Sequence, residues 1–236
     1  AVRDMARDIH PEDIDIGTDA LPEKITELFA NTDDSSAAFG SIIVTIGSHT
    51  FEVTTFREDD QVSDGRHPES VVFADRERDA ARRDITINAL YWNPISSELF
   101  DPYSGLADLT EGLVRFIGDP GVRIKHDALR ILRVVRFRAS IKGQYHPETY
   151  KALQEHASTV EILSGERCLR ELEKILLCPH PEVALEDLWE IDVLEHMEEE
   201  KKELELAASF LSPGGQLVVL CPAHQWLFTP FDQAIG

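Results

Sequence analysis

The chain of 236 residues has no long hydrophobic run and only three cysteines. Its longest late apolar run, "LVVLC", is far shorter than the roughly 20 residues of a membrane-spanning helix, and its first residues lack the pattern of a signal peptide. We therefore expect a soluble, cytoplasmic protein with no membrane partner. Cys168, Cys178 and Cys221 are odd in number and widely spaced, which argues against a zinc site or a disulfide framework and suits a reducing compartment.

Basic residues are also scarce: 23 Lys and Arg stand against 44 Asp and Glu, a net charge of −21. This balance argues against a broad surface for nucleic acid, because phosphate binding needs cationic side chains. One segment, residues 115–142, reverses the balance, with eight basic and two acidic residues and a local charge of +6. The basic residues are Arg115, Arg123, Lys125, Arg130, Arg133, Arg136, Arg138 and Lys142. We expect a cationic surface there.

Two acidic residues stand close together in "PEDIDIGT", residues 11–18. Ile14 and Ile16 alternate with Asp13 and Asp15, which predicts a strand with both carboxylates on one face. Two anions about 7 Å apart repel each other unless a cation lies between them, and hard divalent cations favour oxygen ligands. A magnesium site is one interpretation, and a half-buried strand with its acidic face in water is the other.

A hairpin is predicted in "GSIIVTIGSHTFEVTTF", residues 40–56, with its turn around Gly47 and Ser48. Alternation along the second strand places Glu52 and Thr54 on one face. A third acid could thus stand beside the first two. With 42% hydrophobic residues the chain can bury a proper core.

From about residue 121 the pattern becomes helical, and "HDALRILRVVRFRA" is apolar on most sides. Asp127, Arg130, Arg133 and Arg136 recur every three residues and predict a winding polar stripe on one helix. Partly buried arginines need anions or acceptors, so the stripe is a ligand candidate. The alternative is a helix face that is salt-bridged to acids of the same chain. Further on, "SGERCLRELEKILL" predicts an amphipathic helix capped by Ser164.

Six motifs occur in order: "AVRD", "DIDIGT", "FEVTTFR", "RRDITINAL", "DPYSGLADL" and "HDALRILRVVRFRA". From residue 1 to about residue 190 the chain resembles the class II tRNA nucleotidyltransferase (CCA-adding enzyme) and bacterial poly(A) polymerase family. The resemblance implies an α+β fold, with a DNA-polymerase-beta-like head in which a mixed sheet with helices carries the catalytic acids. An all-helical neck that selects the nucleotide follows.

The resemblance also implies the chemistry. Such enzymes transfer a nucleotide from a nucleoside triphosphate to a 3′-hydroxyl, and two metal ions can lower the charge on the attacking and leaving oxygens. Asp13 and Asp15 match the residues that ligate two Mg²⁺ ions, and Glu52 matches the third catalytic carboxylate. The implied contacts of the triphosphate are Arg3 and Arg83, with Asp84 and Asn88 as positioning groups; without the resemblance, those two could simply cap turns and helix starts.

Asp127 and Arg130 match the family's E-D-x-x-R motif for nucleotide selection, with Arg133 and Arg136 further along the same stripe. C and A both present an amino donor beside a ring-nitrogen acceptor, so a carboxylate and a guanidinium suit both bases and reject U and G. The implied substrates are CTP and ATP, and the implied partner is an RNA 3′-end, in particular that of tRNA. One departure is His126, which stands in the place of the motif's glutamate.

Two further departures bear on the ends of the chain. The family carries Gly-Gly before "VRD", whereas this chain begins with Ala1, so we expect a first strand and its glycines to be missing. The last part, with "PGGQLVVL", is similar to the late part of a class I S-adenosylmethionine-dependent methyltransferase. No glycine-rich cofactor loop precedes it, so we expect no binding of S-adenosylmethionine there.

The expected domains are a head over residues 1–112, a nucleotide-selecting neck over residues 113–192, and a short α/β methyltransferase-like tail over residues 193–236. The expected function is addition of CMP, AMP or both to an RNA 3′-end. One alternative is a catalytically inactive nucleotide-binding fragment or chimera, and a more distant one is a methyltransferase.

Overall fold

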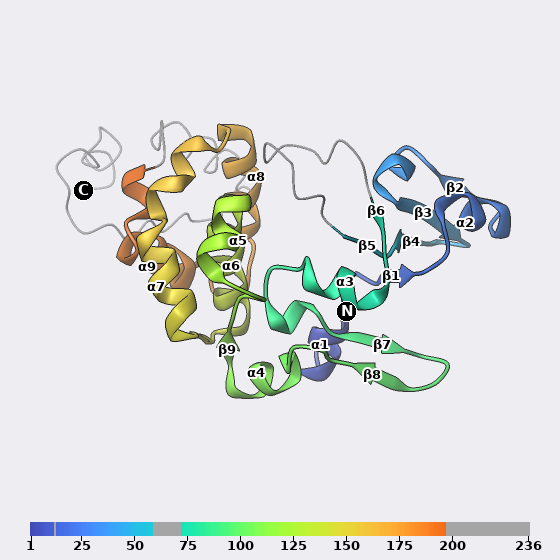
Figure 1. Cartoon of the computed structure of the whole chain (residues 1–236), viewed down its shortest axis with the longest axis horizontal. Helices are drawn as coiled ribbons and strands as arrows, with labels where there is room; N and C mark the ends of the chain where they lie inside the picture. Colours follow the sequence, from blue (N-terminus) through green and yellow to red (C-terminus); the bar gives the residue numbers. More distant parts are fainter. Residues whose placement is uncertain (12, 59–71, 197–236) are drawn as a thin grey trace. The chain divides into compact units, whose positions relative to one another are not determined.

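The computed structural model describes residues 1–11, 13–58 and 72–196, and the elements are labelled in Figure 1. The chain divides into two compact units, Ala1–His126 and a second that begins at Asp127. The predicted domain boundaries at residues 112 and 192 stay predictions. The methyltransferase-like tail, apart from residues 193–196, lies outside the described residues. No described helix is long and apolar enough to cross a membrane.

The first unit alternates short helices with short strands. Its helices are α1 (Val2–Ala6), α2 (Pro22–Leu28), η1 (Ala37–Phe39), α3 (Arg76–Ala81), η2 (Thr86–Asn88), α4 (Gly105–Glu111) and α5 (Pro120–His126). Its strands are β1 (Asp15–Thr18), β2 (Thr32–Asp33), β3 (Ser41–Ile46), β4 (His49–Thr55), β5 (Arg57–Glu58), β6 (Val72–Phe73), β7 (Tyr91–Asn93), β8 (Glu98–Phe100) and β9 (Leu113–Val114).

A four-stranded mixed sheet organises this unit, in the order β1-β4-β3-β2. β1 runs parallel to β4, while β3 is antiparallel to both β4 and β2. The predicted hairpin is therefore confirmed, and the predicted first strand is shorter than expected. Pairing with β4 begins at Asp15, so Asp13 lies before the strand.

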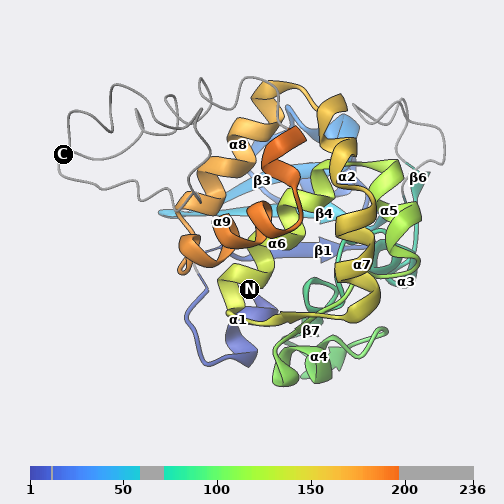
Figure 2. The same cartoon turned by 90° about the vertical axis from the view of Figure 1, so that its left-hand side faces the viewer.

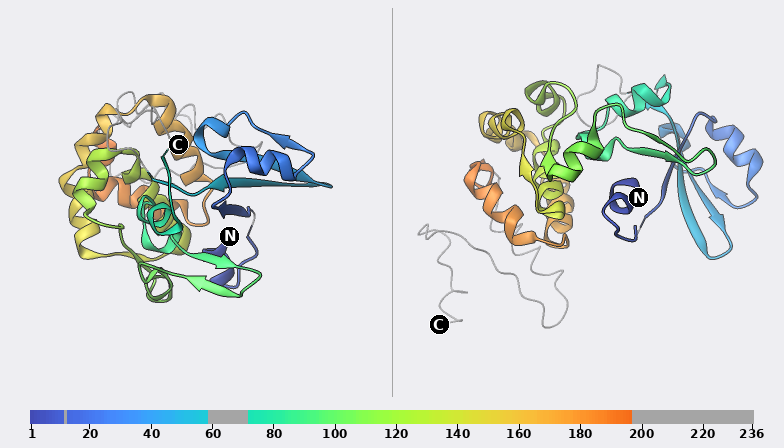
Figure 3. Two further views of the ribbon diagram at one scale, coloured as in Figure 1. Left: turned by 45° about the vertical axis from the view of Figure 1, so that its right-hand side comes forward. Right: turned by 90° about the horizontal axis from the view of Figure 1, so that it is seen from below.

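The two faces of the sheet differ. Ile42, Val44 and Val53 form a buried cluster with Ile25 of α2, and Figure 3 shows α2 over this face of the blue strands. Side chains alternate along a strand, so the neighbouring residues of β1, β3 and β4 point to the opposite face. The alternation predicted for β4 is confirmed, because Val53 is buried whereas Glu52 is exposed.

The second unit is mostly helical. It contains α6 (Leu129–Ile141), α7 (Pro147–Glu155), η3 (Ala157–Ile162), α8 (Gly165–Leu176), α9 (Pro181–Glu190) and η4 (Val193–His196), with one short strand, β10 (Gln144–Tyr145). The most buried helix is α6, whose Ile131, Leu132, Val134 and Val135 are fully shielded from solvent. It packs against α8 and α9, as Figure 2 shows. Ser164 takes the N-cap position of α8, but its side chain makes no capping hydrogen bond.

The predicted continuous polar stripe is wrong in one respect, because Asp127 does not belong to the helix that carries the arginines. The chain leaves the helical conformation after α5 and resumes it at Leu129. The Asp127 carboxylate accepts the backbone N–H of Leu129 at 3.2 Å. Short acidic side chains compete in this way with the helical hydrogen bonds of their own backbone.

The motif "DPYSGLADL" holds η2 in place through α4. The Asp101 carboxylate accepts the N–H groups of Gly105 and Leu106 at 2.6 and 2.9 Å, so it stabilises the start of the helix. The buried Asp108 accepts the Thr86 hydroxyl at 2.6 Å. Because α4 lies so close, a Cβ atom on Gly105 would meet the carbonyl oxygen of Thr86 at 2.2 Å.

We expect Gly105→Ala to lower the free energy of unfolding by about 1–3 kcal/mol, because the added methyl group must push α4 away from η2. The matched control is Thr110→Ala on the same helix, where the side chain is exposed and the change should stay within about 0.5 kcal/mol. Urea unfolding followed by circular dichroism measures both. Equal stability of the two variants would contradict the close packing of α4 on η2.

Candidate active site

The first part of the site is a pair of acids on neighbouring parallel strands. Asp15 of β1 lies directly opposite Glu52 of β4 in the register of the sheet. Residues opposite each other on paired strands share a face, so both carboxylates are on the face away from α2. Both residues are exposed. The structure thus brings together two of the three predicted catalytic acids.

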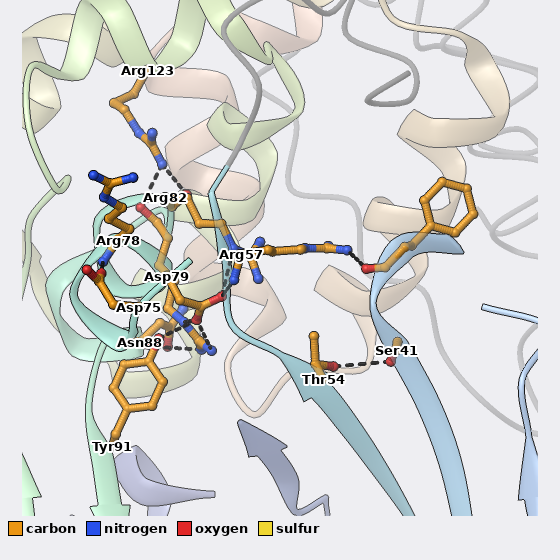
Figure 4. Close-up of polar contacts among 12 residues, drawn as sticks. Ser41, Thr54, Arg57, Asp75, Arg78, Asp79, Arg82, Asn88, Tyr91 and Arg123 are labelled. Carbon is orange, nitrogen blue, oxygen red and sulfur yellow. Dashed lines mark hydrogen bonds and ion pairs between the residues drawn. The ribbon is translucent and has the colours of Figure 1, made fainter. Parts of the chain in front are cut away.

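Glu52 is oriented by polar neighbours on its own face. The Ser41 hydroxyl of β3 donates to Glu52 Oε1 at 2.5 Å, and the Ser41 and Thr54 hydroxyls lie 3.1 Å apart. Figure 4 shows the Ser41 and Thr54 contact. This hydroxyl pair limits the rotation of the glutamate side chain, and its other carboxylate oxygen stays available to a ligand.

Asp13 is exposed and lies two residues before Asp15, outside the strand. Within the residues that the structure describes, no three His, Cys, Asp or Glu side chains converge closely enough to form a metal site by themselves. The assignment of Asp13 and Asp15 as metal ligands stays a prediction.

The second part of the site is a meeting of two arginines at η2. The Arg3 guanidinium donates to the side-chain oxygen of Asn88 at 2.9 Å, across 85 residues of sequence. The Arg83 guanidinium donates to the backbone oxygen of the same residue at 3.1 Å. Asn88 therefore links the two arginines that were predicted to contact a triphosphate. Asp84 was predicted to position the triphosphate together with Arg3, Arg83 and Asn88. It is buried, and only 8% of its surface is exposed.

A residue that the sequence analysis missed, Asp79, lies at the centre of this region. It is 2% exposed and accepts hydrogen bonds from Arg82, Arg83 and the Tyr91 hydroxyl, as Figure 4 shows in part. Burial by itself raises the pKa of the Asp79 carboxyl, but Arg82, Tyr91 and Arg83 together outweigh burial and hold that pKa below its usual value. Burial is also the largest reason why the pKa of Tyr91 is raised. The sequence did contain a signal, because Asp79 precedes the two arginines by three and four residues, the spacing at which side chains of one helix meet.

The second unit carries the predicted nucleotide-selecting residues. Asp127 Oδ1 accepts the Arg167 guanidinium of α8 at 2.9 Å, in addition to the N–H of Leu129. Arg130, the second residue of α6, is 8% exposed. Both of these hydrogen bonds end on the same carboxylate oxygen of Asp127. Arg167 was not found from the sequence, because no local pattern connects it to Asp127.

The remaining basic side chains of residues 115–142 serve the chain's own acids more than expected. Arg136 Nε donates to the buried Glu171 at 2.6 Å, and its guanidinium lies over the ring of Phe137. Arg133 lies at a longer distance from the same ring, 5.9 Å. Further ion pairs join Arg138 to Asp187 and Arg115 to Asp108. The salt-bridged alternative is therefore confirmed for Arg136, and a nucleotide role for Arg133 and Arg136 stays a prediction.

Comparison with protein families gives two matches. Residues 1–115 match the family described as Poly A polymerase head domain. Residues 144–203 match the family described as Probable RNA and SrmB- binding site of polymerase A.

Curated relatives are identical to this chain at about a third of the aligned residues. A CCA-adding enzyme of Lactobacillus helveticus is 35% identical over 207 residues, which is 86% of this chain and 52% of that protein. The human mitochondrial CCA tRNA nucleotidyltransferase 1 is 37% identical over 201 residues, which is 82% of this chain and 46% of that protein. The chain thus spans about half the length of the curated relatives it matches.

Solved structures agree with these relatives. The Bacillus stearothermophilus CCA-adding enzyme in complex with CTP is 32% identical and superimposes with a TM-score of 0.76, covering 88% of this chain and 51% of that one. A tRNA nucleotidyltransferase complexed with a primer tRNA and an incoming ATP analog is 26% identical, with a TM-score of 0.71, and covers 88% of this chain and 61% of that one. The expected α+β head with a mixed sheet, followed by a helical part, is confirmed. Over the matched residues, the chain belongs to the family of CCA-adding enzymes and poly(A) polymerases, which are nucleotidyltransferases.

Proposed function

We propose that this chain carries the catalytic and nucleotide-selecting parts of a template-independent RNA nucleotidyltransferase, which adds CMP, AMP or both to the 3′-end of tRNA. The observation that carries the proposal is the register of Asp15 against Glu52, which places two carboxylates on the exposed face of the sheet. The likeness to CCA-adding enzymes over more than four fifths of the chain supports it.

The donor set suits magnesium. Mg²⁺ prefers carboxylate oxygens and is commonly held by one or two carboxylates together with substrate phosphates and waters, not by an all-protein cage. Asp13 and Asp15 would hold two such ions, and Glu52, fixed by Ser41, is the third acid. When bound, the ions would offset the charge on the attacking and leaving oxygens of the transfer. The exposure of all three acids is compatible with a ligand shell completed by the nucleotide.

Arg3 and Arg83 are the proposed contacts of the triphosphate, and Asn88 positions both of them. A guanidinium has five N–H donors in a planar fork, so an arginine that already binds a carbonyl or an amide oxygen can still donate to phosphate. We assign Asp84 a positioning role, because it is buried directly beside Arg83 in the sequence.

Base selection is assigned to Asp127 and Arg130. Asp127 Oδ1 accepts hydrogen bonds from Arg167 and Leu129, and we assign Oδ2 as the acceptor of a base amino group. An acceptor beside a donor fits C and A and mismatches U and G. Arg133 and Arg136 would contribute to this region less directly. The cytoplasm is the proposed location.

The proposal is tested by incubating the full chain and Mg²⁺ with radiolabelled ATP or CTP and a tRNA that lacks its 3′-terminal CCA. Growth of the tRNA by CMP, AMP or both is the expected result, and EDTA should abolish it. Absence of incorporation at high enzyme concentration, with the chain folded by circular dichroism, would refute catalysis by this chain and favour the inactive nucleotide-binding alternative.

We expect Asp15→Asn and Asp13→Asn each to lower the rate of nucleotide incorporation by about 100-fold or more, because an amide cannot supply the charge that holds the metal ions. Asp19→Asn, which changes an exposed acid just after β1, is the matched control and should keep the parental rate. If either variant at position 13 or 15 retained the parental rate and magnesium requirement, the metal assignment would be wrong.

Asp127→Ala and Arg130→Ala should reduce the preference for CTP and ATP over UTP and GTP by about tenfold, because each removes one partner of the base edge. The rate with the preferred nucleotide should fall less. Competition among four labelled triphosphates measures the preference. Glu155→Ala, at an exposed ion pair of α7, serves as the control. Unaltered preference in both variants would remove the pair from base selection.

A further inference from the structure

Asp79 is a buried carboxylate whose donors come from three parts of the first unit. Its Oδ1 accepts Arg82 Nε at 2.9 Å and the backbone N–H of Arg57 at 3.3 Å. Its Oδ2 accepts Arg83 Nη2 at 3.2 Å and the Tyr91 hydroxyl at 2.5 Å. Figure 4 shows Asp79 between Arg57, Arg82 and Tyr91. A buried charge is tolerated only when it is paired and hydrogen-bonded, and this one is both.

The arrangement draws two consecutive arginines to a single point. Arg82 and Arg83 follow Asp79 by three and four residues, the two spacings at which helical side chains reach the same neighbour. Here each oxygen of Asp79 takes one guanidinium. The backbone is held as well, since the Arg123 guanidinium of α5 donates to the carbonyl oxygens of both Arg82 and Arg83.

Arg83 has further contacts that restrain its guanidinium. Its guanidinium lies 4.7 Å from the centre of the Tyr91 ring and donates to the Asn88 carbonyl, whose residue also binds Arg3. Described residues use three of its five N–H groups, one each on Nε, Nη1 and Nη2, which leaves two that can donate to phosphate oxygens.

The contact between Arg57 and Asp79 links the arginine pair to the strand that carries Glu52. Arg57 begins β5, two residues after the end of β4, the strand that carries Glu52. Its backbone N–H donates to Asp79, so one carboxylate connects the end of the acid-bearing strand to the arginine pair. Asp79 itself is too deeply buried to contact a nucleotide.

We propose that Asp79 is a positioning residue, which holds the Arg83 guanidinium beside Arg3 in the orientation that receives a triphosphate. This inference rests on the proposed function of the same site. The physical reason is preorganisation: an arginine that is already ordered loses less side-chain entropy when an anion binds. The Tyr91 hydroxyl supports the carboxylate with a further hydrogen bond.

The test measures binding of inorganic tripolyphosphate and of ATP to the full chain by calorimetry. With Asp79→Asn we expect the Kd of both ligands to rise about tenfold, because an amide cannot hold two guanidinium groups. In the labelled-nucleotide assay the KM for ATP should rise similarly while kcat changes less than about twofold, as expected when ground-state binding alone is lost.

The matched control is Asp75→Ala in the same helix. Asp75 caps α3 by accepting the N–H of Arg78 at 2.8 Å, so its loss weakens the helix without touching the guanidinium of Arg83. Both Kd values should stay within about twofold of the parent. A second variant, Tyr91→Phe, removes one hydrogen bond from Asp79 but keeps the ring beside Arg83, and should raise Kd about threefold. If circular dichroism shows that Asp79→Asn is unfolded, Tyr91→Phe provides the test.

The outcomes separate the two proposals. If the parent binds triphosphate and the folded Asp79→Asn and Tyr91→Phe variants bind it equally well, the positioning role of Asp79 is wrong while the proposed function stands. If Asp75→Ala weakens binding as much as they do, the effect is one of helix stability and the role is again wrong. If the parent binds neither ligand, the proposed function fails and the role of Asp79 fails with it.

Discussion

The arginine side of the candidate site depends on one interaction, the multiple hydrogen bonding of the buried Asp79 carboxylate. Removing a charge from water is costly, so such a group persists in a core only where several donors meet it. Those donors are the guanidiniums that face the site, the Tyr91 hydroxyl, and a backbone N–H next to the acid-bearing strand. The solvation requirement of one carboxylate therefore brings α3, β5 and β7 together.

The acid side depends instead on the register of a mixed sheet. A shift of one residue between β1 and β4 would turn Asp15 to the other face of the sheet and separate it from Glu52. The cluster of Ile25, Ile42, Val44 and Val53 fixes through its burial which face of β3 and β4 turns toward α2. Glu52 lies on the opposite face of β4 as a consequence, so the apolar face of this strand is separate from its acid-bearing face.

The helical unit shows how a cationic sequence can serve both packing and recognition. Arg136 and Arg138 form ion pairs with Glu171 and Asp187, whose side chains are almost fully buried. The Arg130 side chain is buried, and Arg167 contacts the Asp127 carboxylate. The number of basic residues in this segment is therefore larger than the number that can bind phosphate, because some of them are neutralised by acids of the same chain.

The sequence by itself determined the local features: the hairpin around Gly47 and Ser48, the face of β4 that carries Glu52, the helix over residues 165–176, and the motifs that identify the family. These depend on residues a few positions apart, where periodicity and turn chemistry decide. Only the tertiary structure decided that Asp15 faces Glu52, that Arg3 meets Asn88, and that Arg167 orients Asp127. These pairs are distant along the chain, and their contact follows from how whole elements pack, which no local pattern records.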